Sequence, residues 1–529
     1  MKSMTSTERI FLRLERDGFP MDVVGITTLE PAGDTELTYD DVRLTIVRVL
    51  AEAPYLSRRV SQAPLGIGED KWVDEAQVDL DHHVQEIFCP GEGTERDLLD
   101  LVLDLTAEPL DRSRPLWQVW LVHGMADRRS ALILRGHHAL TDGLGFMHLY
   151  QSIFETDPPS APAAQTARSS APTRGVAAPS AGIPGPFAGP RSGYEPPALV
   201  RAAGEIPQRA VITARTSMRI ARVLTRVAPR AMSRTTRELR NRLPGGDMAS
   251  PPGGAAGTSD SGGVARSTRR PPFVPSFTDH PPVTRFNRHI KDTGRAMAVL
   301  SLPLDEVQAA RRAHPGATVN DVILAVVSGA LRTYLADFDE IPDRPLVTTC
   351  PVSVRTRPDG DGGQASGNAF TAIWVDLPVQ LDDPVERLTA VHARSSQAKG
   401  GLHRSRASWD VLSDLGDLLL PGMVSAAMAF AGSRPFHLIP PTQNLSVSTM
   451  RGSKTPLYFC GRKVEHLYAR TIICPPVYLF IHAISYDGKL EIGILSAREL
   501  LPDPEAVARN MRAELDALLD RVAVSGARS

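Results

Sequence analysis

Hydrophobic and polar residues follow regular patterns in two stretches of the chain, which are separated by a stretch without periodicity. Between residues 5 and 156, short apolar runs alternate with segments whose apolar residues recur at helical spacing. Residues 37–53 are of the helical kind, and residues 131–134 form an apolar run of strand length. The same mixture resumes at about residue 286 and continues to the C-terminus. The pattern predicts α/β structure in both stretches.

The intervening stretch is rich in Pro, Ala, Ser and Gly. Residues 158–197 and 245–282 have this composition and almost no periodicity, which is typical of flexible linkers. A chain of 529 residues is long enough for two to four domains of roughly 100–200 residues each. We therefore predict an N-terminal domain over residues 1–156, a flexible linker over 157–285 and a C-terminal domain over 286–529.

Within the linker, residues 197–243 form a strongly basic segment. It carries eleven arginines against Glu205 and Glu238, and its apolar residues recur at roughly helical spacing. A basic amphipathic helix between flexible linkers is typical of attachment to an anionic membrane or lipid-droplet surface. A solvated helix that packs across the two domains is the alternative. Nucleic acid is not the expected partner, because no aromatic residues are interleaved for base stacking.

The overall composition narrows the class of protein. An apolar fraction of 42%, a charged fraction of 22% and a net charge of −1 are those of a soluble globular protein rather than a disordered or uniformly basic one. The four cysteines are far apart and form no Cys-x-x-Cys pair, so we expect neither a structural zinc site nor a disulfide framework.

Neither secretion nor a membrane span is expected. The N-terminus carries charges where a signal peptide needs an apolar run. The longest apolar stretch, residues 418–432, is shorter than the ~20 residues that span a bilayer, and Pro421 and Gly422 interrupt it. We expect a cytoplasmic protein, peripherally associated with membranes or lipid droplets.

The strongest chemical signal is the adjacent pair His137 and His138, followed by Asp142 and Gly143. The pair lies between the predicted strand 131–134 and a segment of helical periodicity, so we expect it at a strand end, where side chains often project into a site. A neutral imidazole can take a proton from a hydroxyl near pH 7. These residues alone leave a structural role or metal binding open, although no third ligand is obvious.

A second histidine pair, His82 and His83, has no Asp-Gly after it, and we interpret that pair as structural or surface-exposed. Two further motifs have an architectural interpretation as well. Trp117, in Pro115-Leu116-Trp117, is a candidate core residue. Asn320 and Asp321 follow Thr318 in the pattern of a helix N-cap with a carboxylate three residues on.

The combined motifs His137-His138-x-x-x-Asp142-Gly143, Pro115-Leu116-Trp117 and Asn320-Asp321-Val-x-Leu-Ala resemble those of the bacterial wax ester synthase/diacylglycerol acyltransferase family. That family belongs to the acyltransferases similar to chloramphenicol acetyltransferase. Residues 6–12, 351–355, 367–368 and 485–490 are also similar to it. One departure concerns the Ser-Asn-Val-Pro-Gly-Pro stretch that usually precedes Pro-Leu-Tyr, since residues 446–452 lack the Asn and both prolines. The acceptor preference therefore stays open.

The resemblance implies an α/β fold with two chloramphenicol-acetyltransferase-like domains, each a mixed sheet with flanking helices, and an active-site tunnel between them. It implies that His138 is the general base, that His137 and Asp142 orient the loop, and that Asp142 pairs with an arginine. Gly143, Pro115, Leu116, Trp117, Asn320 and Asp321 would have structural roles.

The activity implied by the resemblance is acyl transfer from acyl-CoA to an alcohol. The expected acceptor is diacylglycerol, which gives triacylglycerol, with long-chain alcohols, which give wax esters, as the close second choice. Acyl-CoA is a co-substrate, and neither a metal nor another cofactor is implied. Two alternatives remain: a condensation-domain-like enzyme that uses a carrier-bound thioester, and a non-catalytic lipid-surface protein.

Overall fold

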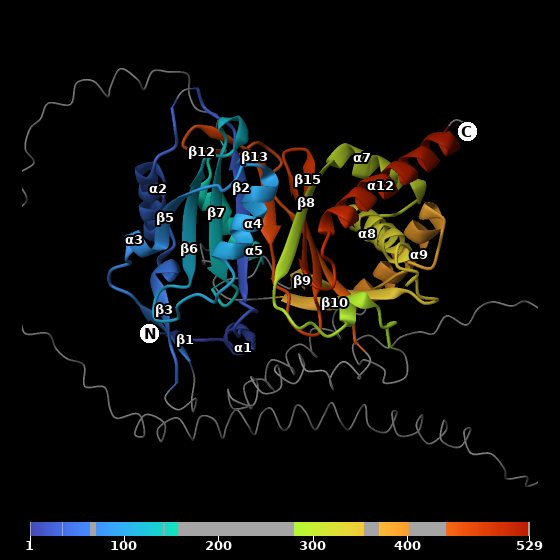
Figure 1. Ribbon diagram of the computed structural model, residues 1–529, viewed down its shortest axis with the longest axis horizontal. Coiled ribbons are helices and arrows are strands. Elements are labelled where there is room, and N and C mark those ends of the chain that lie inside the picture. Colours follow the sequence, from blue (N-terminus) through green and yellow to red (C-terminus); the bar gives the residue numbers. More distant parts are fainter. Residues whose placement is uncertain are drawn as a thin grey trace, which may run out of the picture.

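The computed structural model describes residues 2–33, 35–63, 70–140, 143–156, 280–353, 370–400 and 441–526. The described residues form two halves that lie side by side, each built on a six-stranded sheet (Figure 1). Asp142, the basic segment 197–243 and the apolar run 418–432 lie outside the described residues. The predictions made for them therefore stay predictions.

The N-terminal sheet has the strand order β12-β13-β2-β7-β6-β5. β5 runs parallel to β6, and the other neighbours are antiparallel, so the sheet is mixed. The strands are β2 (Asp22–Leu29), β5 (Val84–Phe88), β6 (Trp117–His123), β7 (Ser130–His137), β12 (Tyr458–Phe459) and β13 (Arg462–Arg470). Two of these strands come from the C-terminal part of the chain. The predicted boundaries at 156 and 286 therefore do not separate the two sheets.

The C-terminal sheet has the order β10-β9-β11-β14-β15-β8 and is also mixed, because β11 is parallel to both of its neighbours. Its strands are β8 (Arg295–Pro303), β9 (Leu346–Ser353), β10 (Phe370–Leu377), β11 (Leu445–Arg451), β14 (Leu479–Tyr486) and β15 (Lys489–Ala497). A small third sheet joins β1 (Lys2–Ser3), β4 (Lys71–Asp74) and β3 (Arg58–Ser61). Two mixed sheets with flanking helices confirm the predicted fold class.

The helices of the N-terminal half are α1 (Ser6–Leu14), α2 (Tyr39–Glu52), α3 (Leu80–His83), α4 (Glu95–Leu105) and α5 (Gly143–Ile153). Those of the C-terminal half are α7 (Leu304–Ala310), α8 (Val319–Ala336), α9 (Pro384–Gly400) and α12 (Pro504–Gly526). Short 3-10 turns lie at η1 (Pro54–Ser57), η3 (Ala126–Arg128), η4 (Arg285–Asn287) and η5 (Arg311–Ala313). α2 and α5 confirm the two helices predicted from periodicity before the linker.

A threonine begins four of these helices in the same way. In α1, α2, α4 and α8 the threonine side chain accepts the backbone N–H three residues on, and the acidic residue at that position accepts the N–H of the threonine. This reciprocal capping box satisfies two backbone donors that would otherwise lack partners at a helix start. The local sequence Thr-x-x-Asp/Glu therefore fixes where each helix begins.

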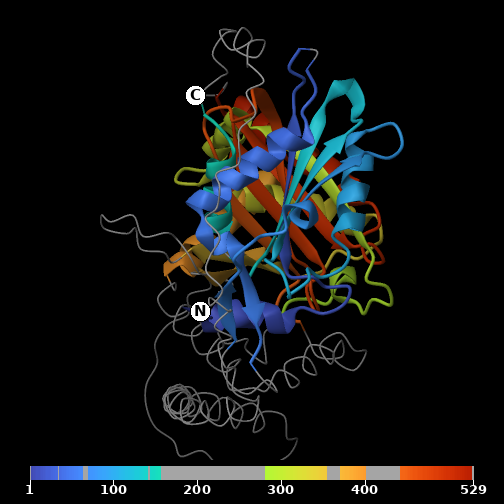
Figure 2. The same cartoon turned by 90° about the vertical axis from the view of Figure 1, so that its left-hand side faces the viewer.

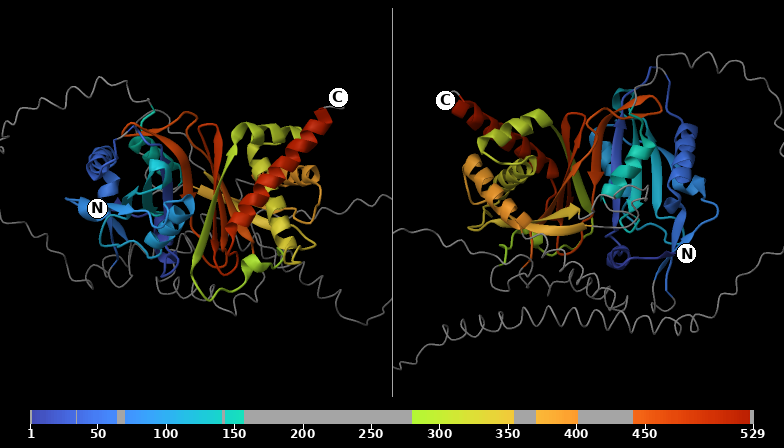
Figure 3. Two further views of the ribbon diagram at one scale, coloured as in Figure 1. Left: turned by 45° about the horizontal axis from the view of Figure 1, so that its top comes forward. Right: turned by 180° about the vertical axis from the view of Figure 1, so that it is seen from behind.

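The N-terminal sheet is buried on both faces. Alternate residues of β7 separate into two core clusters: Leu132 and Leu134 pack with α2 and α5, whereas Ile133 packs with α4 and with Met297 of β8. Figure 2 shows α2 crossing in front of the strands, on the face remote from the C-terminal half. In both panels of Figure 3 the orange and red strands lie between the blue-cyan half and the green-yellow helices. The core between the two sheets therefore contains side chains from both halves.

Helix α8 is the central helix of the C-terminal core. Among the described residues it is the one helix long and apolar enough to cross a membrane. Most of its residues are buried, and it packs against α9 and α12 over the outer face of the C-terminal sheet (Figure 1). Its apolar character is therefore explained by its place in a protein core.

Candidate active site

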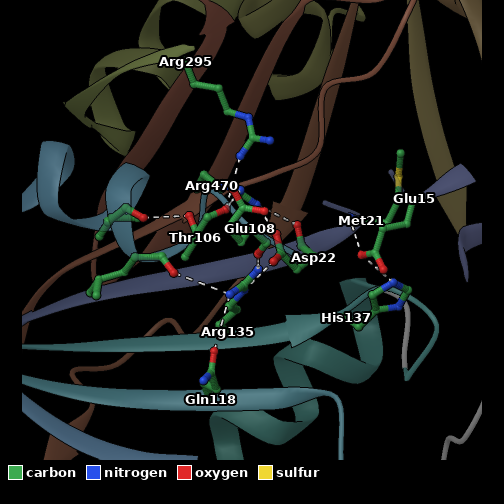
Figure 4. A network of polar contacts seen from close by, with 12 residues as sticks. Glu15, Met21, Asp22, Thr106, Glu108, Gln118, Arg135, His137, Arg295 and Arg470 are labelled. Atoms are coloured by element: carbon green, nitrogen blue, oxygen red, sulfur yellow. Dashed lines mark hydrogen bonds and ion pairs between the residues drawn. The ribbon is translucent and has the colours of Figure 1, made fainter. Parts of the chain in front are cut away.

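His137 is the last residue of β7, and both of its ring nitrogens face polar groups. Nδ1 accepts the backbone N–H of Ala139 at 2.9 Å, and Nε2 lies 3.1 Å from Oε2 of Glu15 (Figure 4). Because Nδ1 is an acceptor here, the neutral ring carries its proton on Nε2, next to the carboxylate. The side chain is fully buried, and these two contacts hold its orientation.

Glu15, which directly follows α1, is a buried carboxylate with several partners. Arg112 donates to Oε1 at 2.9 Å, and the backbone N–H of Met21 donates to Oε2 at 3.1 Å. Burial by itself would raise the pKa of Glu15, but His137, Arg112 and the Met21 N–H outweigh burial and lower the pKa to about 2. Glu15 is therefore ionised throughout the neutral pH range.

His138 follows the end of the strand and has a different environment. Its backbone N–H donates to the carbonyl of Met21 at 2.8 Å, and its ring stacks on Phe11 with centroids 4.1 Å apart and planes 13° apart. Phe11 lies on α1, within the stretch 6–12 that resembles the family. The structure confirms that the histidine pair ends a strand. Helix α5 then begins at Gly143, three residues after Leu140.

An apolar pocket lies between α2, α5 and the strands β6 and β7. Its polar lining residues are Gln118, Arg135 and His137. The apolar lining includes Ile46, Val49, Leu134, Leu140, Phe146 and Leu149. The resemblance predicted a tunnel between the two halves, whereas this pocket lies inside the N-terminal half. Its lining is mostly apolar, and its polar members include His137, so it offers apolar contacts beside the histidine turn.

A buried charge network lies beside the histidines in the same sheet. Asp22, paired with His137 in the register of β2 and β7, forms ion pairs with Arg135 and Arg470 (Figure 4). Burial would raise the pKa of Asp22, but the two guanidinium groups outweigh burial and lower it. Arg470 comes from β13. The C-terminal part of the chain therefore supplies a charge next to the candidate site.

Arg295 of β8 extends this network into the C-terminal half. Arg470 and Arg295 both donate to the carbonyl of Thr106, at 3.0 and 3.4 Å, just beyond the C-terminal end of α4. Burial and the neighbouring Arg470 lower the pKa of Arg295 to about 9, which still leaves it charged at neutral pH. Cations are favourable at the negative end of a helix dipole, so α4 helps to hold the two arginines.

In the Pro-Leu-Trp motif, Leu116 and Trp117 lie in the core of the N-terminal half. Trp117 is buried, and its indole N–H donates to the carbonyl of Leu56 at 2.7 Å. The ring of His83 stacks on Trp117, and its Nδ1 donates to the Trp117 carbonyl at 2.7 Å. His83 is therefore structural, as predicted. Leu116 is fully buried, Pro115 forms a β-bridge with Arg59, and Trp117 also lines the pocket.

The Asn-Asp motif begins α8 as predicted. The buried carboxylate of Asp321 accepts the N–H of Thr318 at 2.9 Å and also contacts Nδ1 of His392, at 2.9 Å, and Oγ of Ser395 on α9. Oδ1 of Asn320 accepts the hydroxyl of Thr449 on β11 at 2.9 Å. The motif thus connects α8 to α9 and to β11 of the C-terminal sheet. It does not contribute to the histidine site.

Gly452 is the last residue of the stretch 446–452, which departs from the family pattern, and the fold leaves no room for a side chain at this position. A Cβ at Gly452 would lie 2.5 Å from the carbonyl oxygen of Ser485, so no larger residue fits there without a backbone shift. Elsewhere, the four cysteines are free thiols. Among the described ranges, no cluster of three or more His, Cys, Asp or Glu side chains could hold a metal ion.

Family models match most of the chain. The wax ester synthase/diacylglycerol acyltransferase catalytic domain matches residues 4–323, and the WS/DGAT C-terminal domain matches residues 366–519. A probable diacylglycerol O-acyltransferase of Mycobacterium tuberculosis, tgs2, is 27% identical and covers 99% of this chain and 100% of its own length. A putative diacylglycerol O-acyltransferase of the same organism is 29% identical, covering 97% and 99%.

Solved structures share the fold. The wax ester synthase/diacylglycerol acyltransferase from Marinobacter aquaeolei VT8 is 23% identical, with a TM-score of 0.62 over 99% of this chain and 100% of that one. The first condensation domain of the calcium-dependent antibiotic synthetase is 14% identical, with a TM-score of 0.52 over 99% and 96%. At these identities the likeness establishes the architecture.

Proposed function

The chain belongs to the wax ester synthase/diacylglycerol acyltransferase family, and from this premise we propose that it transfers the acyl group of acyl-CoA to the free hydroxyl of diacylglycerol. The product would be triacylglycerol. Long-chain alcohols are the second class of acceptor, and they would give wax esters. The relatives named diacylglycerol O-acyltransferases, which align over nearly their whole length, support the order of these two choices.

The observation that carries the proposal is that an apolar pocket lies beside the histidine turn, with His137 and Leu140 in its lining. The lining of the pocket includes Gly136 and His137, which directly precede His138 in the chain. A fatty acyl chain in this pocket would be held by apolar contacts, each buried methylene contributing about 0.8 kcal/mol. Its thioester end would then lie near the histidine turn.

In the proposed reaction, His138 is the general base. It takes the proton from the acceptor hydroxyl as that oxygen attacks the thioester carbonyl, and a tetrahedral intermediate forms. The C–S bond then breaks, the ester remains, and the departing CoA sulfur receives the proton from His138. Base catalysis of this kind contributes about 10²–10⁴-fold. The step involves no oxidation or reduction, so the proposal includes no redox cofactor, and it assigns the role of the base to the imidazole of His138.

Two other residues of the motif have supporting roles in this proposal. His137 is fixed by its contacts to Glu15 and Ala139, so it orients the turn rather than exchanging protons with substrate. Asp142 is expected to pair with an arginine and to hold the other end of the turn.

The test is an assay of the purified full-length protein with labelled palmitoyl-CoA, offering diacylglycerol and hexadecanol side by side. The proposal expects labelled triacylglycerol as the main product, with less wax ester. Hydrolysis to free palmitate without any ester product would refute it. Transfer to hexadecanol alone would keep the reaction class and change the acceptor.

We also propose that the basic segment 197–243 attaches the enzyme to anionic lipid surfaces, where diacylglycerol resides. Each arginine near such a surface contributes about 1 kcal/mol, and the attraction decays within a Debye length of ~8 Å at physiological salt. Vesicle binding should rise with anionic lipid content and fall steeply with salt. Replacing Arg215, Arg219, Arg222 and Arg226 with Gln should weaken binding and spare turnover of a detergent-dispersed acceptor. Salt-independent binding to neutral vesicles would contradict this mode of attachment.

A further inference from the structure

Glu15 contacts both sides of the histidine turn. Its Oε2 lies 3.1 Å from Nε2 of His137 and accepts the backbone N–H of Met21 at 3.1 Å, and the carbonyl of Met21 accepts the N–H of His138 at 2.8 Å. We propose that Glu15 is a positioning residue for acyl transfer, which fixes the tautomer of His137 and the backbone position of His138. This proposal rests on the function proposed above.

The first route acts through the ring of His137. With the ring proton on Nε2, Nδ1 is free to accept the N–H of Ala139, and this bond closes the turn that contains His138. With the proton on Nδ1, two N–H groups would face each other across 2.9 Å and the bond would be lost. A carboxylate oxygen 3.1 Å from Nε2 favours the first arrangement, because its negative charge attracts the positive hydrogen of an N–H group at that nitrogen.

The second route acts through the backbone of Met21. The amide N–H of Met21 donates to Glu15, and its carbonyl accepts the N–H of His138, so both ends of this residue are held. The turn that contains His138 is therefore held by His137, and the backbone N–H of His138 is held by Met21. Both His137 and Met21 contact the carboxylate of Glu15. A shift of the carboxylate would displace the base and its supporting turn together.

Glu15 is itself held rigidly. Its side chain is 2% exposed, and Arg112 donates to Oε1 while also donating to the carbonyl of Leu12 at 2.6 Å, near the end of α1. Both carboxylate oxygens are therefore occupied. Figure 4 shows Glu15 on the Met21 side of the ring of His137, apart from the Asp22 network. The nearby Asp22 forms ion pairs with Arg135 and Arg470.

The direct test is the tautomer of His137, read from long-range ¹H–¹⁵N spectra of ¹⁵N-histidine-labelled protein. The signal is assigned by its loss in His137→Asn. We expect the Nε2–H form in the wild type and in Glu15→Gln, whose amide oxygen can still accept, and a mixture of tautomers in Glu15→Ala. An unchanged Nε2–H signal in a folded Glu15→Ala variant would overturn the proposal.

The kinetic test separates positioning from general stability. Glu15→Ala should lower kcat about 100-fold, the cost typical of displacing a catalytic group by about 1 Å, and change the KM values less than twofold. The kcat of Glu15→Gln should be at least tenfold higher than that of Glu15→Ala. Glu8→Gln, which alters the capping box of the same helix without touching His137, is the matched control and should keep wild-type kcat.

The outcomes are distinguishable from a failure of the proposed function. If the wild type transfers no acyl group to either acceptor, the function fails, and the tautomer measurement still decides the role of Glu15. If the wild type is active and Glu15→Ala matches its kcat, the positioning role is overturned. The positioning role is overturned as well if Glu15→Gln and Glu15→Ala lose equal activity although only the latter changes the tautomer.

Discussion

A carboxylate–imidazole pair in the N-terminal half can be compared with one in the C-terminal half, and the two differ in the surroundings of the imidazole. In the N-terminal half, Glu15 lies 3.1 Å from His137, whose side chain is fully buried. In the C-terminal half, Asp321 lies 2.9 Å from His392, whose side chain is 26% exposed. In the first pair both ring nitrogens are engaged, one beside the carboxylate and the other by the backbone N–H of Ala139. The second is centred on the carboxylate, which contacts Thr318, Ser395 and His392.

The comparison shows that the pair itself does not define a role. The role of each pair depends on which part of the fold the two side chains hold through their other contacts. At His137 that part is the turn beside an apolar pocket, and at Asp321 it is the start of a core helix. Changes to the first pair should therefore affect rate, whereas changes to the second should affect stability.

Removing each imidazole sharpens this contrast most strongly. His137→Ala should lower kcat about 100-fold, because the turn that carries the base loses its support. His392→Ala should keep kcat within threefold, since it removes a half-buried ring from a structural cluster. Steady-state rates with palmitoyl-CoA and diacylglycerol, measured on variants with native far-UV circular dichroism, check both. Equal losses in the two variants would remove the distinction.

The reverse experiment targets the second carboxylate. Asp321→Asn should lower the free energy of unfolding by about 3 kcal/mol, the cost typical of breaking a buried charged contact, and should leave kcat of the folded protein near wild type. Asn320→Ala, which removes only the bond to Thr449, should cost about 1 kcal/mol. Denaturant unfolding of both variants provides the measurement. A large kcat effect with unchanged stability would contradict the architectural role.

The charge of Glu15 should also affect how the stability of the protein depends on pH in acid. The pKa of Glu15 is lowered from 4.5 to about 2, so the folded protein holds this proton less tightly than the unfolded chain. Its stabilisation, about 3 kcal/mol, is present above pH 4.5 and is lost as the pH falls toward 2. The difference in melting temperature between wild type and Glu15→Gln should therefore shrink from pH 6 to pH 3. A constant difference would show that the charge of Glu15 contributes nothing.

The smallest expected effect concerns the pocket. Val119→Phe fills part of it and should shift kcat/KM about tenfold from palmitoyl-CoA toward octanoyl-CoA, the equivalent of losing about two buried methylenes. Val122→Phe overpacks the opposite face of the same strand and is the matched control. Competition assays with mixed chain lengths give the ratio directly. The same shift in both variants would show that the pocket does not hold the acyl chain.

The sequence predicted what depends on local patterns. The strand that ends in His137, the helix from Gly143 and the capping box of Thr318 and Asp321 all follow from periodicity or from a four-residue motif. The structural roles of His83 and Trp117 were predicted from their context and are confirmed by their contacts. The roles of His138 and Asp142 in catalysis remain predictions.

The partners of the histidine turn could not be predicted in the same way. Phe11, Glu15 and Arg470 reach the site from other parts of the chain, and the last arrives because β12 and β13 join the N-terminal sheet. Periodicity encodes local structure and carries no information about which strands pair. One signal was available: Asp22 and Arg135 are charged residues within apolar strands, a pattern that indicates a buried ion pair.

The central claim is that His138 supplies the base for acyl transfer. The most direct measurement is the rate of labelled palmitoyl transfer to diacylglycerol by wild type and by His138→Ala at matched melting temperature. The account predicts a loss of about 10³–10⁴-fold, in the upper part of the range for a general base and larger than the loss in His137→Ala. A folded His138→Ala variant that keeps its rate within tenfold of wild type, or exceeds that of His137→Ala, would contradict it.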